Sequence, residues 1–355
     1  MQYDVKTKKL PKSEVEMEVS LPAIFLDNAR RKALKMLAIS LEIPGFRKGH
    51  VPENVVTEKV GEAKLLEEAV NILLKEHFHK IVAQEGQDII GQPKISITKL
   101  AIGNPVEFKA VCAILPVFKL PDYRAIARSS VASAKLDKND TEATNKEIED
   151  VLLQIRRNKA HFDYHKNNLE DKGHQHPEIK DEDLPELNNE FAKVAGNFKN
   201  LDELKGKVKQ NITEEKKNRN IEKKRAAIMD ELVKNTKIDL PEILIESEIE
   251  KSLAQMKNDI ERSGGKFADY LAHVKKTEED LKKDLRESSE KKAKIQLIFN
   301  KIAVAEKLEP NKEILENEVK EILKHYPEAT EQNARIYVST ILLNQEILKL
   351  LEKAE

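Results

Sequence analysis

Ile43-Pro44-Gly45-Phe46-Arg47-Lys48-Gly49-His50-Val51-Pro52 is the stretch from which the fold of this chain is best approached. Its two glycines accept backbone angles that other residues resist, and a proline stiffens each end, so a short, fixed and exposed loop is predicted. Phe46, Arg47 and Lys48 would project from the tip of that loop. The aromatic ring can stack or become buried against a partner, and the two cations can meet phosphates or carboxylates. The pattern indicates a docking loop.

Three stretches of the sequence resemble a known family. The hexapeptide PGFRKG at 44–49 is followed, after two residues, by Pro52, and this pattern resembles the ribosome-docking signature of trigger factor, the bacterial chaperone of nascent chains. The stretches DLPELNNEF at 183–191 and IDLPE at 238–242 resemble the family's entry into its helical body, in the expected order. The resemblance extends over most of the chain.

The resemblance implies an ATP-independent chaperone that docks on the large ribosomal subunit at the exit tunnel and holds nascent or unfolded polypeptides. In the family this loop contacts an exit-tunnel protein and the adjacent ribosomal RNA. By resemblance, Phe46, Arg47 and Lys48 carry the contact, and Gly45 and Gly49 shape the turn. Dimers away from the ribosome are common in the family, so a homodimer is a further expectation.

The surroundings of the loop are also cationic. Glu42 is the only acid between residues 28 and 50, and the preceding segment adds four cations: Arg30, Arg31, Lys32 and Lys35. A local basic face is therefore expected, although such a run is more often only the solvated side of an amphipathic helix. The family usually has lysine where this chain has His50, which removes a fixed charge near neutral pH.

The composition favours long solvated helices over a layered enzyme core. The 355 residues allow two or three domains, and the 39% of hydrophobic residues suffice for small cores. Charged residues reach 35%, aromatic residues only 5%, and there are 11 glycines. The formal net charge of −1 provides no global field toward nucleic acid, so an anionic partner must be met locally.

Compartment and redox chemistry follow from absences in the sequence. The N-terminus has no apolar run of signal-peptide length, and no run of about 18 apolar residues could span a bilayer. A cytoplasmic protein without membrane association is expected. The single cysteine, Cys112, lies in the apolar alternation 111–114, which excludes an internal disulfide and predicts a small buried side chain. No catalytic residue is predicted.

Residues 1–115 are predicted to form an α+β ribosome-binding domain. The run 15–19 alternates at period two and indicates a strand, and 21–40 recurs at helical spacing. Helical stretches follow the docking loop. Two more alternating runs, 95–98 and 106–111, flank turn residues and indicate a hairpin that closes the domain.

Residues 116–183 are predicted to be a connector. It would run extended past Pro121, form one helix around 142–160 and continue as a polar loop over 165–183. Trigger factors ordinarily insert an FKBP-like prolyl isomerase domain at this place, and this chain has no room for one. Isomerase activity is therefore not carried over from the family.

Residues 184–355 are predicted to form a mostly α-helical, elongated chaperone domain with projecting arms. Asn200 with Glu203 has the spacing of a helix cap, as does Thr277 before three acids. Apolar positions thin out over 213–220, so that helix cannot be buried along its whole length. The seam is too interrupted to predict a coiled coil.

Client binding is expected from apolar side chains that are spread over several helices rather than gathered in one pocket. Helical apolar periodicity normally means core, so each of these residues can also be a packing residue. A chaperone cradle would mix apolar patches with hydrophilic surface and so permit weak, sequence-tolerant contacts. The candidates are Met256, Phe267, Tyr270, Leu271, Ile298, Phe299, Ile336 and Leu343.

Metal ions and cofactors are not expected. His77 and His79, like His174 and His176, stand two residues apart and so do not share a helix face, and no cysteine accompanies them. The sequence has neither GxGxxG nor GxxxxGK[ST], the loops that cradle phosphates. No metal site, cofactor or nucleotide use is therefore predicted.

Two other classes of function stay open. A prolyl-isomerase-associated folding factor would need an aromatic-lined pocket, whereas the sequence has no tryptophan; a tetrapeptide isomerisation assay decides this alternative. A helical adaptor bound to RNA or the ribosome, without holding activity, would use the loop and its cations for RNA alone.

Overall fold

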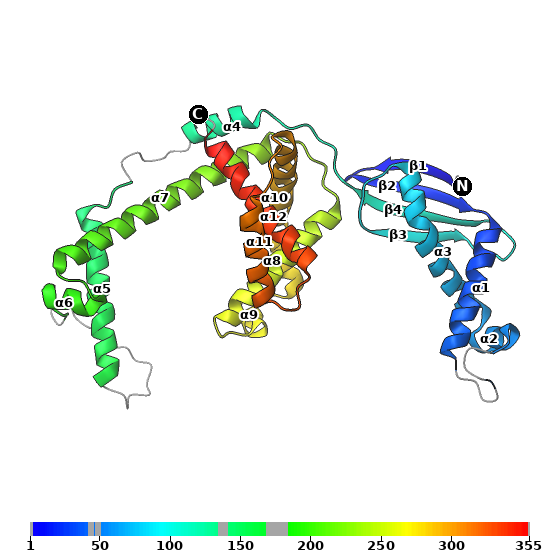
Figure 1. Ribbon diagram of the computed structural model, residues 1–355, viewed down its shortest axis with the longest axis horizontal. Coiled ribbons are helices and arrows are strands. Elements are labelled where there is room, and N and C mark those ends of the chain that lie inside the picture. Colours follow the sequence, from blue (N-terminus) through cyan, green and yellow to red (C-terminus); the bar gives the residue numbers. More distant parts are fainter. Residues whose placement is uncertain (1–2, 42–45, 47–50, 134–140, 168–183, 354–355) are drawn as a thin grey trace. The chain divides into compact units, whose positions relative to one another are not determined.

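The computed structural model describes residues 3–41, 46, 51–133, 141–167 and 184–353 (Figure 1). Its strands form one antiparallel sheet in the order β1-β2-β4-β3. The strands are β1 Asp4–Leu10, β2 Glu14–Leu21, β3 Ile89–Lys99 and β4 Val106–Ile114. The helices are α1 Ala23–Ser40, α2 Glu53–Val60, α3 Glu62–Glu85, α4 Tyr123–Ser133, α5 Asn145–Asn167, α6 Asn189–Gly196, α7 Leu201–Lys234, α8 Glu242–Arg262, α9 Phe267–Val274, α10 Glu278–Ala305, α11 Lys312–His325 and α12 Glu331–Glu352.

The described residues thus combine a small sheet near the N-terminus with helices over the rest of the chain, which confirms the predicted class of an α+β domain followed by helices. Tertiary contacts group residues 1–120 with 236–301, as unit 1, and residues 121–235 with 302–355, as unit 2. Each unit therefore combines segments that are far apart in the sequence. The continuous domains expected with boundaries at 115 and 183 stay a prediction.

The sheet buries one face through strict alternation along its two central strands. Val19 of β2 lies opposite Phe108 of β4, so the inward residues of both strands share a face. The strands predicted over 15–19 and 106–111 are confirmed. The buried residues are Val15, Met17, Val19 and Leu21 on β2, and Val106, Phe108, Ala110 and Cys112 on β4.

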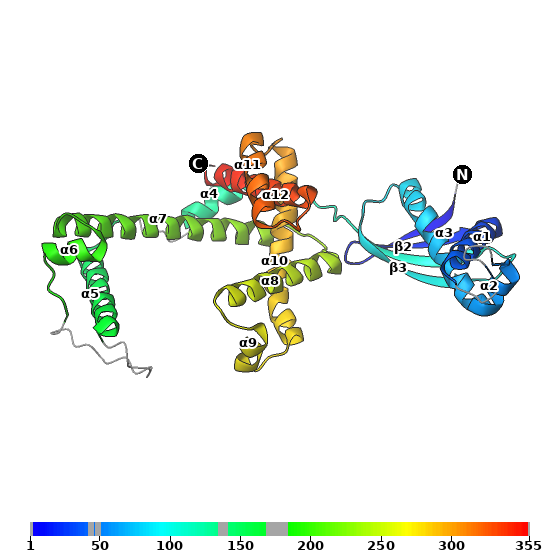
Figure 2. The same cartoon turned by 60° about the horizontal axis from the view of Figure 1, so that its bottom comes forward.

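Helices α1 and α3 pack together and supply the second layer of this core (Figures 1 and 2). The buried stripe of α1 is rich in alanine, and these small side chains allow a close approach. The stripe consists of Leu26, Ala29, Ala33, Leu34 and Ala38. Cys112 is buried in the same core, and burial raises the pKa of its thiol to about 11. The thiol stays protonated near neutral pH, as a packing residue should.

The sequence pattern did not predict strand β1. It pairs with β2 from Asp4 opposite Ser20 to Leu10 opposite Glu14, at the edge of the sheet. Its sequence, DVKTKKL, is mostly charged and its residues are mainly exposed. The expected strands therefore lacked one member, because an edge strand with a solvated face needs little apolar signal.

The turn between β1 and β2 contacts the start of α8 inside unit 1. The Ser13 hydroxyl donates to the Asp239 carbonyl oxygen at 2.6 Å, and the Ser13 N–H donates to Asp239 Oδ2 at 3.3 Å. Lys12 Nζ lies 3.3 Å from Glu242 Oε2, and Arg286 Nη2 lies 2.9 Å from the same oxygen. The hydrogen bonds from Arg286 and then Lys12 lower the pKa of Glu242 to about 2, against burial, which raises it.

Gly91 of β3 closes the same junction. Its φ is +70°, and a Cβ placed there would lie 1.9 Å from Ile243 Cδ1 of α8. Only glycine combines that backbone angle with that approach. Beyond the junction, α8 and α10 share a small core formed by Leu240, Ile245, Ile249 and Ala293.

Unit 2 is organised along α7. Asn200 Oδ1 accepts the Glu203 N–H at 2.9 Å, which confirms the expected cap. The buried residues of α7 lie near its two ends, with none over 213–220, so the predicted thinning is also confirmed. They are Leu204, Val208, Ile228 and Leu232. Helices α5 and α6 pack against the first end, while α4 and α12 contact α7 as well.

Two expectations for the connector need correction. The segment after Pro121 is helical rather than extended: Tyr123 opens α4, and its hydroxyl donates to Glu306 Oε1 at 2.5 Å. Helix α5 runs from 145 to 167, so the helix expected over 142–160 exists but continues beyond His165, where a loop was expected. Residues 168–183 lie outside the described residues. Long-range contacts, absent from any local pattern, stabilise α4.

Candidate functional site

The docking loop lies between α1 and α2. Gly45, Arg47, Lys48, Gly49 and His50 lie outside the described residues. Phe46 is described, forms a bend and is 42% exposed. Its aromatic side chain is thus not buried in the fold, which keeps it available to a partner. The chain returns to the core of unit 1 at the buried Val51, next to the N-cap Pro52 of α2.

The last turns of α1 carry two apolar residues that sequence reasoning missed. Met36 and Ile39 are each 61% exposed, and Arg31 and Lys35 lie exposed on the same helix. Residues three and four apart share a helix face, so Arg31, Lys35 and Ile39 line one side, with Met36 beside them. Exposed apolar side chains beside two cations form a surface that can contact a partner. The sequence carried a signal for them, since the segment that forms α1 has more apolar residues than its one buried stripe contains.

The expected basic face is only partly present. Arg30 forms two hydrogen bonds with Glu62 of α3, both at 3.1 Å, and Lys32 Nζ lies 2.7 Å from Glu76 Oε1. The hydrogen bond from Lys32 lowers the pKa of Glu76. These two cations therefore join α1 to α3, because α3 supplies acids that lie far away in sequence. Among the described residues of the cluster, Arg31 and Lys35 alone are left to face a partner.

Helix α9 presents the second candidate surface, and its mainly apolar sequence, FADYLAHV, is only partly covered. Not one of its residues is buried. The rings of Phe267 and Tyr270 stack with their centroids 6.4 Å apart, and Lys257 Nζ lies 4.9 Å from the centroid of Phe267. Met256 on α8 and Leu271 are half-buried, like the two rings. Four of the expected client-binding residues therefore belong to the contacting pair α8 and α9.

Ionic contacts hold the ends of this helical pair. Lys257 Nζ lies 3.1 Å from Oε2 of Glu278, the first residue of α10. The Thr277 N–H donates to Asp280 Oδ2 at 3.1 Å while the Asp280 N–H donates to Thr277 Oγ1, the reciprocal cap expected from the sequence. The aromatic surface of α9 is thus held by charged neighbours, not by a core. Such a surface can bind apolar chain segments weakly and reversibly.

The other four expected client-binding residues do not share this place. Ile298 and Phe299 on α10 are 0% and 3% exposed, so they are core residues and the expectation that they contact clients is wrong. Ile336 on α12 is 59% exposed, beside Tyr337 at 61%, and Leu343 is half-buried. Periodicity alone made Phe299 and Phe267 equal candidates for client binding, because both stand among apolar residues at helical spacing.

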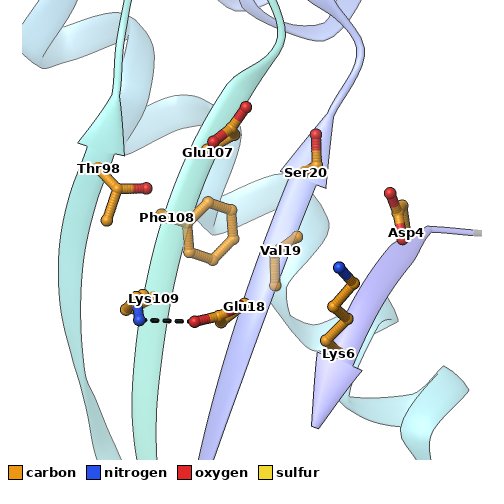
Figure 3. A pocket seen from close by; sticks show the side chains of 9 residues that line it. All are labelled: Asp4, Lys6, Glu18, Val19, Ser20, Thr98, Glu107, Phe108 and Lys109. Carbon is orange, nitrogen blue, oxygen red and sulfur yellow. Dashed lines mark ion pairs between the residues drawn. The ribbon is translucent and has the colours of Figure 1, made fainter.

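The outward face of the sheet carries a hollow of about 460 Å³ that is lined mainly by charged and polar side chains (Figure 3). Lys109 Nζ lies 2.6 Å from Glu18 Oε1, and this hydrogen bond lowers the pKa of Glu18 and raises that of Lys109. Lys99 and Glu107 form a second cross-strand pair at 3.4 Å. The charges satisfy one another in solvent, as on an ordinary outward sheet face.

His77 packs in the sheet layer, whereas His79 is exposed. The Tyr3 hydroxyl lies 3.0 Å from His77 Nδ1, and the rings of Phe25 and His77 lie edge to face at 4.7 Å. Burial lowers the pKa of His77. No three metal-ligating side chains meet among the described residues, which do not include His174 and His176. Within the same residues, no helix has the length and apolarity needed to cross a bilayer.

Comparisons with known proteins cover nearly the whole chain. Residues 2–155 match the family described as bacterial trigger factor protein, and residues 200–352 match the C-terminus of bacterial trigger factor protein. The trigger factor of Clostridium kluyveri is 22% identical, with 98% of each chain covered. That of Halothermothrix orenii is 25% identical, with 93% of this chain and 92% of the relative covered. The first alignment spans 429 positions, more than the 355 residues here, so that relative contains residues without a counterpart in this chain.

A solved structure gives the same result for the fold. It was reported for promiscuous substrate recognition in folding and assembly activities of the trigger factor chaperone, and it is similar to this chain with a TM-score of 0.54 and 18% identity. The match covers 99% of this chain and 100% of the solved one. The two matched sequence ranges, the full-length relatives and the sheet followed by helices agree: this chain belongs to the trigger factor family.

Proposed function

We propose that this chain is an ATP-independent chaperone that docks on the large ribosomal subunit at the exit tunnel, in the cytoplasm, and holds nascent or unfolded polypeptides. Membership of the trigger factor family supports a ribosome-associated chaperone. Docking is assigned to Phe46, Arg47 and Lys48, with Gly45 and Gly49 shaping the loop. Holding requires no covalent step and no cofactor, and no prolyl isomerase activity is assigned.

The observation that carries the holding function is the partly exposed aromatic surface of α9. Phe267 and Tyr270 would each gain from further burial against a partner, because the folded chain leaves them partly exposed. A charged surface surrounds them and keeps a loaded complex soluble. The related chaperone of the solved structure recognises substrates promiscuously, and a stacked aromatic pair with a nearby cation favours such tolerance, since it makes few directional demands.

Docking is tested by replacing Phe46, Arg47 and Lys48 together with alanine. The variant should keep its circular dichroism spectrum and lose co-sedimentation with 70S ribosomes, since the loop lies outside the core. The Met36→Ser, Ile39→Ser variant of α1 should weaken co-sedimentation as well.

A matched control removes one exposed aromatic residue and two exposed cations from another surface. Lys320, Lys324 and Tyr326 at the end of α11 serve this purpose, because all three are exposed. Their triple alanine variant should sediment with ribosomes like the wild type. Unchanged co-sedimentation of the loop variant would reject the docking assignment.

Holding is tested with the Phe267→Ala, Tyr270→Ala variant of α9, since alanine preserves helix propensity. Suppression of aggregation of an unfolded client, measured without and with ribosomes, should fall while the melting temperature stays nearly constant. Suppression equal to that of the wild type would remove α9 from the client-binding surface. A chain that binds ribosomes but suppresses no aggregation would be an adaptor.

A further inference from the structure

His161 and His165 form an unassigned pair of metal-ligating side chains on α5. They stand four residues apart within one helix. Positions i and i+4 of an α-helix lie one above the other, with Cβ atoms about 5–6 Å apart. Two imidazoles at this separation can turn a nitrogen each toward one metal ion, and the same spacing recurs in helical zinc sites. His77 and His79, two residues apart, point to different sides of α3 and cannot do so.

Solvent reaches the pair. His165 is exposed and His161 is half-buried. The ring of Tyr164 meets that of His165 edge to face, with the two centroids 5.8 Å apart. This contact restricts the swing of the His165 ring and still leaves the side chain exposed. An ion from solution can therefore reach the imidazoles while the core of unit 2 stays closed.

The stripe of α5 that carries the pair holds no fixed charge. Gln154 and Asn158 continue it toward the start of the helix, because steps of three and four residues follow one face. Both are exposed, and Gln154 Nε2 donates to Asn158 Oδ1 at 3.0 Å. Of these four side chains, only the imidazoles are strong ligands for a transition metal. The neutral amides add no repulsion against a cation.

Two cations stand close to the pair in sequence, and one of them is neutralised. Lys159 pairs with Asp163, and its Nζ also lies 5.6 Å from the centroid of the Phe162 ring. Arg157 stands one helical turn before His161, and residues four apart are neighbours on a helix surface. A bound ion would therefore meet some repulsion from Arg157, which predicts moderate rather than very tight binding.

The type of ligand selects the class of ion. Neutral imidazole suits zinc, copper and nickel, whereas magnesium and calcium prefer oxygen ligands. Two imidazoles leave the remaining coordination positions to water, so the site would be open, unlike a structural zinc site with four protein ligands. Among divalent ions of this class, Cu²⁺ should bind more tightly than Zn²⁺.

We propose that His161 and His165 bind a divalent ion of the copper, nickel and zinc class, which bridges two successive turns of α5. The bridge fixes two side chains in positions that only the helical backbone provides, so the bound ion stabilises this end of the helix. The site goes beyond the proposed chaperone function, since it uses neither the docking loop nor α9.

The first test uses the full chain, with Tyr164 as a local reporter. Bound Cu²⁺ quenches the emission of a neighbouring tyrosine, and this emission is measurable because the chain has six tyrosines and no tryptophan. Titration with CuCl₂ should quench part of it. Tyr164→Phe should lose most of the quenching, while isothermal titration calorimetry shows a nearly unchanged affinity. Undiminished quenching in this variant would place the ion elsewhere and overturn the proposal.

Matched variants test the two ligands and their spacing. His161→Gln with His165→Gln should weaken the binding of Cu²⁺ and Zn²⁺ about tenfold, because the second contact is no longer intramolecular. His79→Gln with His273→Gln removes two exposed imidazoles from separate helices and should bind like the wild type. Phe162→His with His165→Gln keeps the number of imidazoles but sets them one residue apart. This variant should bind as weakly as the first, and Phe162 is exposed enough to be replaced.

Hydrogen exchange locates the effect in the chain. Amide exchange over 158–167 should slow several-fold with ZnCl₂ and stay unchanged with MgCl₂. The variant with glutamine at both positions should show no slowing. Equal affinity of that variant and the wild type, or full affinity of the variant with adjacent histidines, would overturn the proposal. A wild type that binds no CuCl₂ would do the same, and aggregation suppression without added metal would still test the chaperone function separately.

Discussion

Phe108 and Phe267 carry the same side chain in opposite surroundings. Phe108 lies in the sheet layer, 1% exposed, between α1, α3 and the central strands. Phe267 lies on α9, partly exposed, with Tyr270 and Lys257 as its ring contacts. The first region uses apolar area for folding. The second region leaves apolar surface accessible to a partner. Stability and binding are therefore assigned to different parts of one chain.

The largest expected effect tests that separation directly. Phe108→Ala should lower the free energy of unfolding by about 3–5 kcal/mol, since it leaves a cavity in a closed core. Phe267→Ala should lower it by less than about 1 kcal/mol, because part of the ring already faces water and no core cavity is left behind. Urea denaturation followed by circular dichroism measures both. Similar losses for the two variants would show that α9 is covered in solution.

A smaller change in unfolding free energy should distinguish a glycine that packs against a neighbour from one that faces open space. Gly91→Ala and Gly103→Ala both force alanine to a positive φ, of +70° and +73°, but only Gly91 faces a neighbour, Ile243. The Gly91 variant should lose about 1–3 kcal/mol more in unfolding free energy than the Gly103 variant. Adding Ile243→Ala should recover part of the difference. Equal losses would mean that the contact with α8 is not formed.

Gly206→Ala should act in the opposite direction. The added methyl group meets open space and reduces the freedom of the unfolded chain, so the unfolding free energy should rise by about 0.5–1 kcal/mol. Differential scanning calorimetry would report this as a higher melting temperature. A loss of stability would show that a neighbouring group occupies the space beside Gly206 in solution.

The last expected effect depends on pH and concerns the polar junction at Glu242. Its pKa lies near 2 in the folded chain against a usual 4.5, so its contribution to stability is complete above about pH 4.5 and is lost as the pH falls toward 2. Glu242→Gln should therefore flatten the pH dependence of the unfolding free energy in that window. Glu250→Gln, at an exposed position of the same helix, provides the comparison. An identical flattening in both variants would contradict the role of Arg286.

Much of the sheet layer was predictable from the sequence, because a buried face forces alternation. The strands at 15–19 and 106–111 followed from period two, and α1 from its helical stripe. The caps at Asn200 and Thr277 were predictable for a related reason, since capping residues act within one turn of the helix that they begin.

The rest depends on partners that are distant in sequence. Strand β1 forms because it pairs with the edge of β2. Helix α4 is stabilised by the hydrogen bond from Tyr123 to Glu306 and by its contacts with α7. Glu62 and Glu76 neutralise two cations that looked free in the sequence. Local patterns also could not tell buried Phe299 from partly exposed Phe267, because periodicity shows that a face is apolar but not what covers it.

The lone thiol in the sheet layer has a practical consequence. Cys112 is 1% exposed and resists deprotonation, so maleimide and disulfide reagents should leave the native chain unlabelled. The chain also has no tryptophan. A cysteine engineered on α9 or beside Gly206 would thus be the sole attachment point for a dye, and an engineered indole the sole emitter of its kind, without any prior removal of native residues.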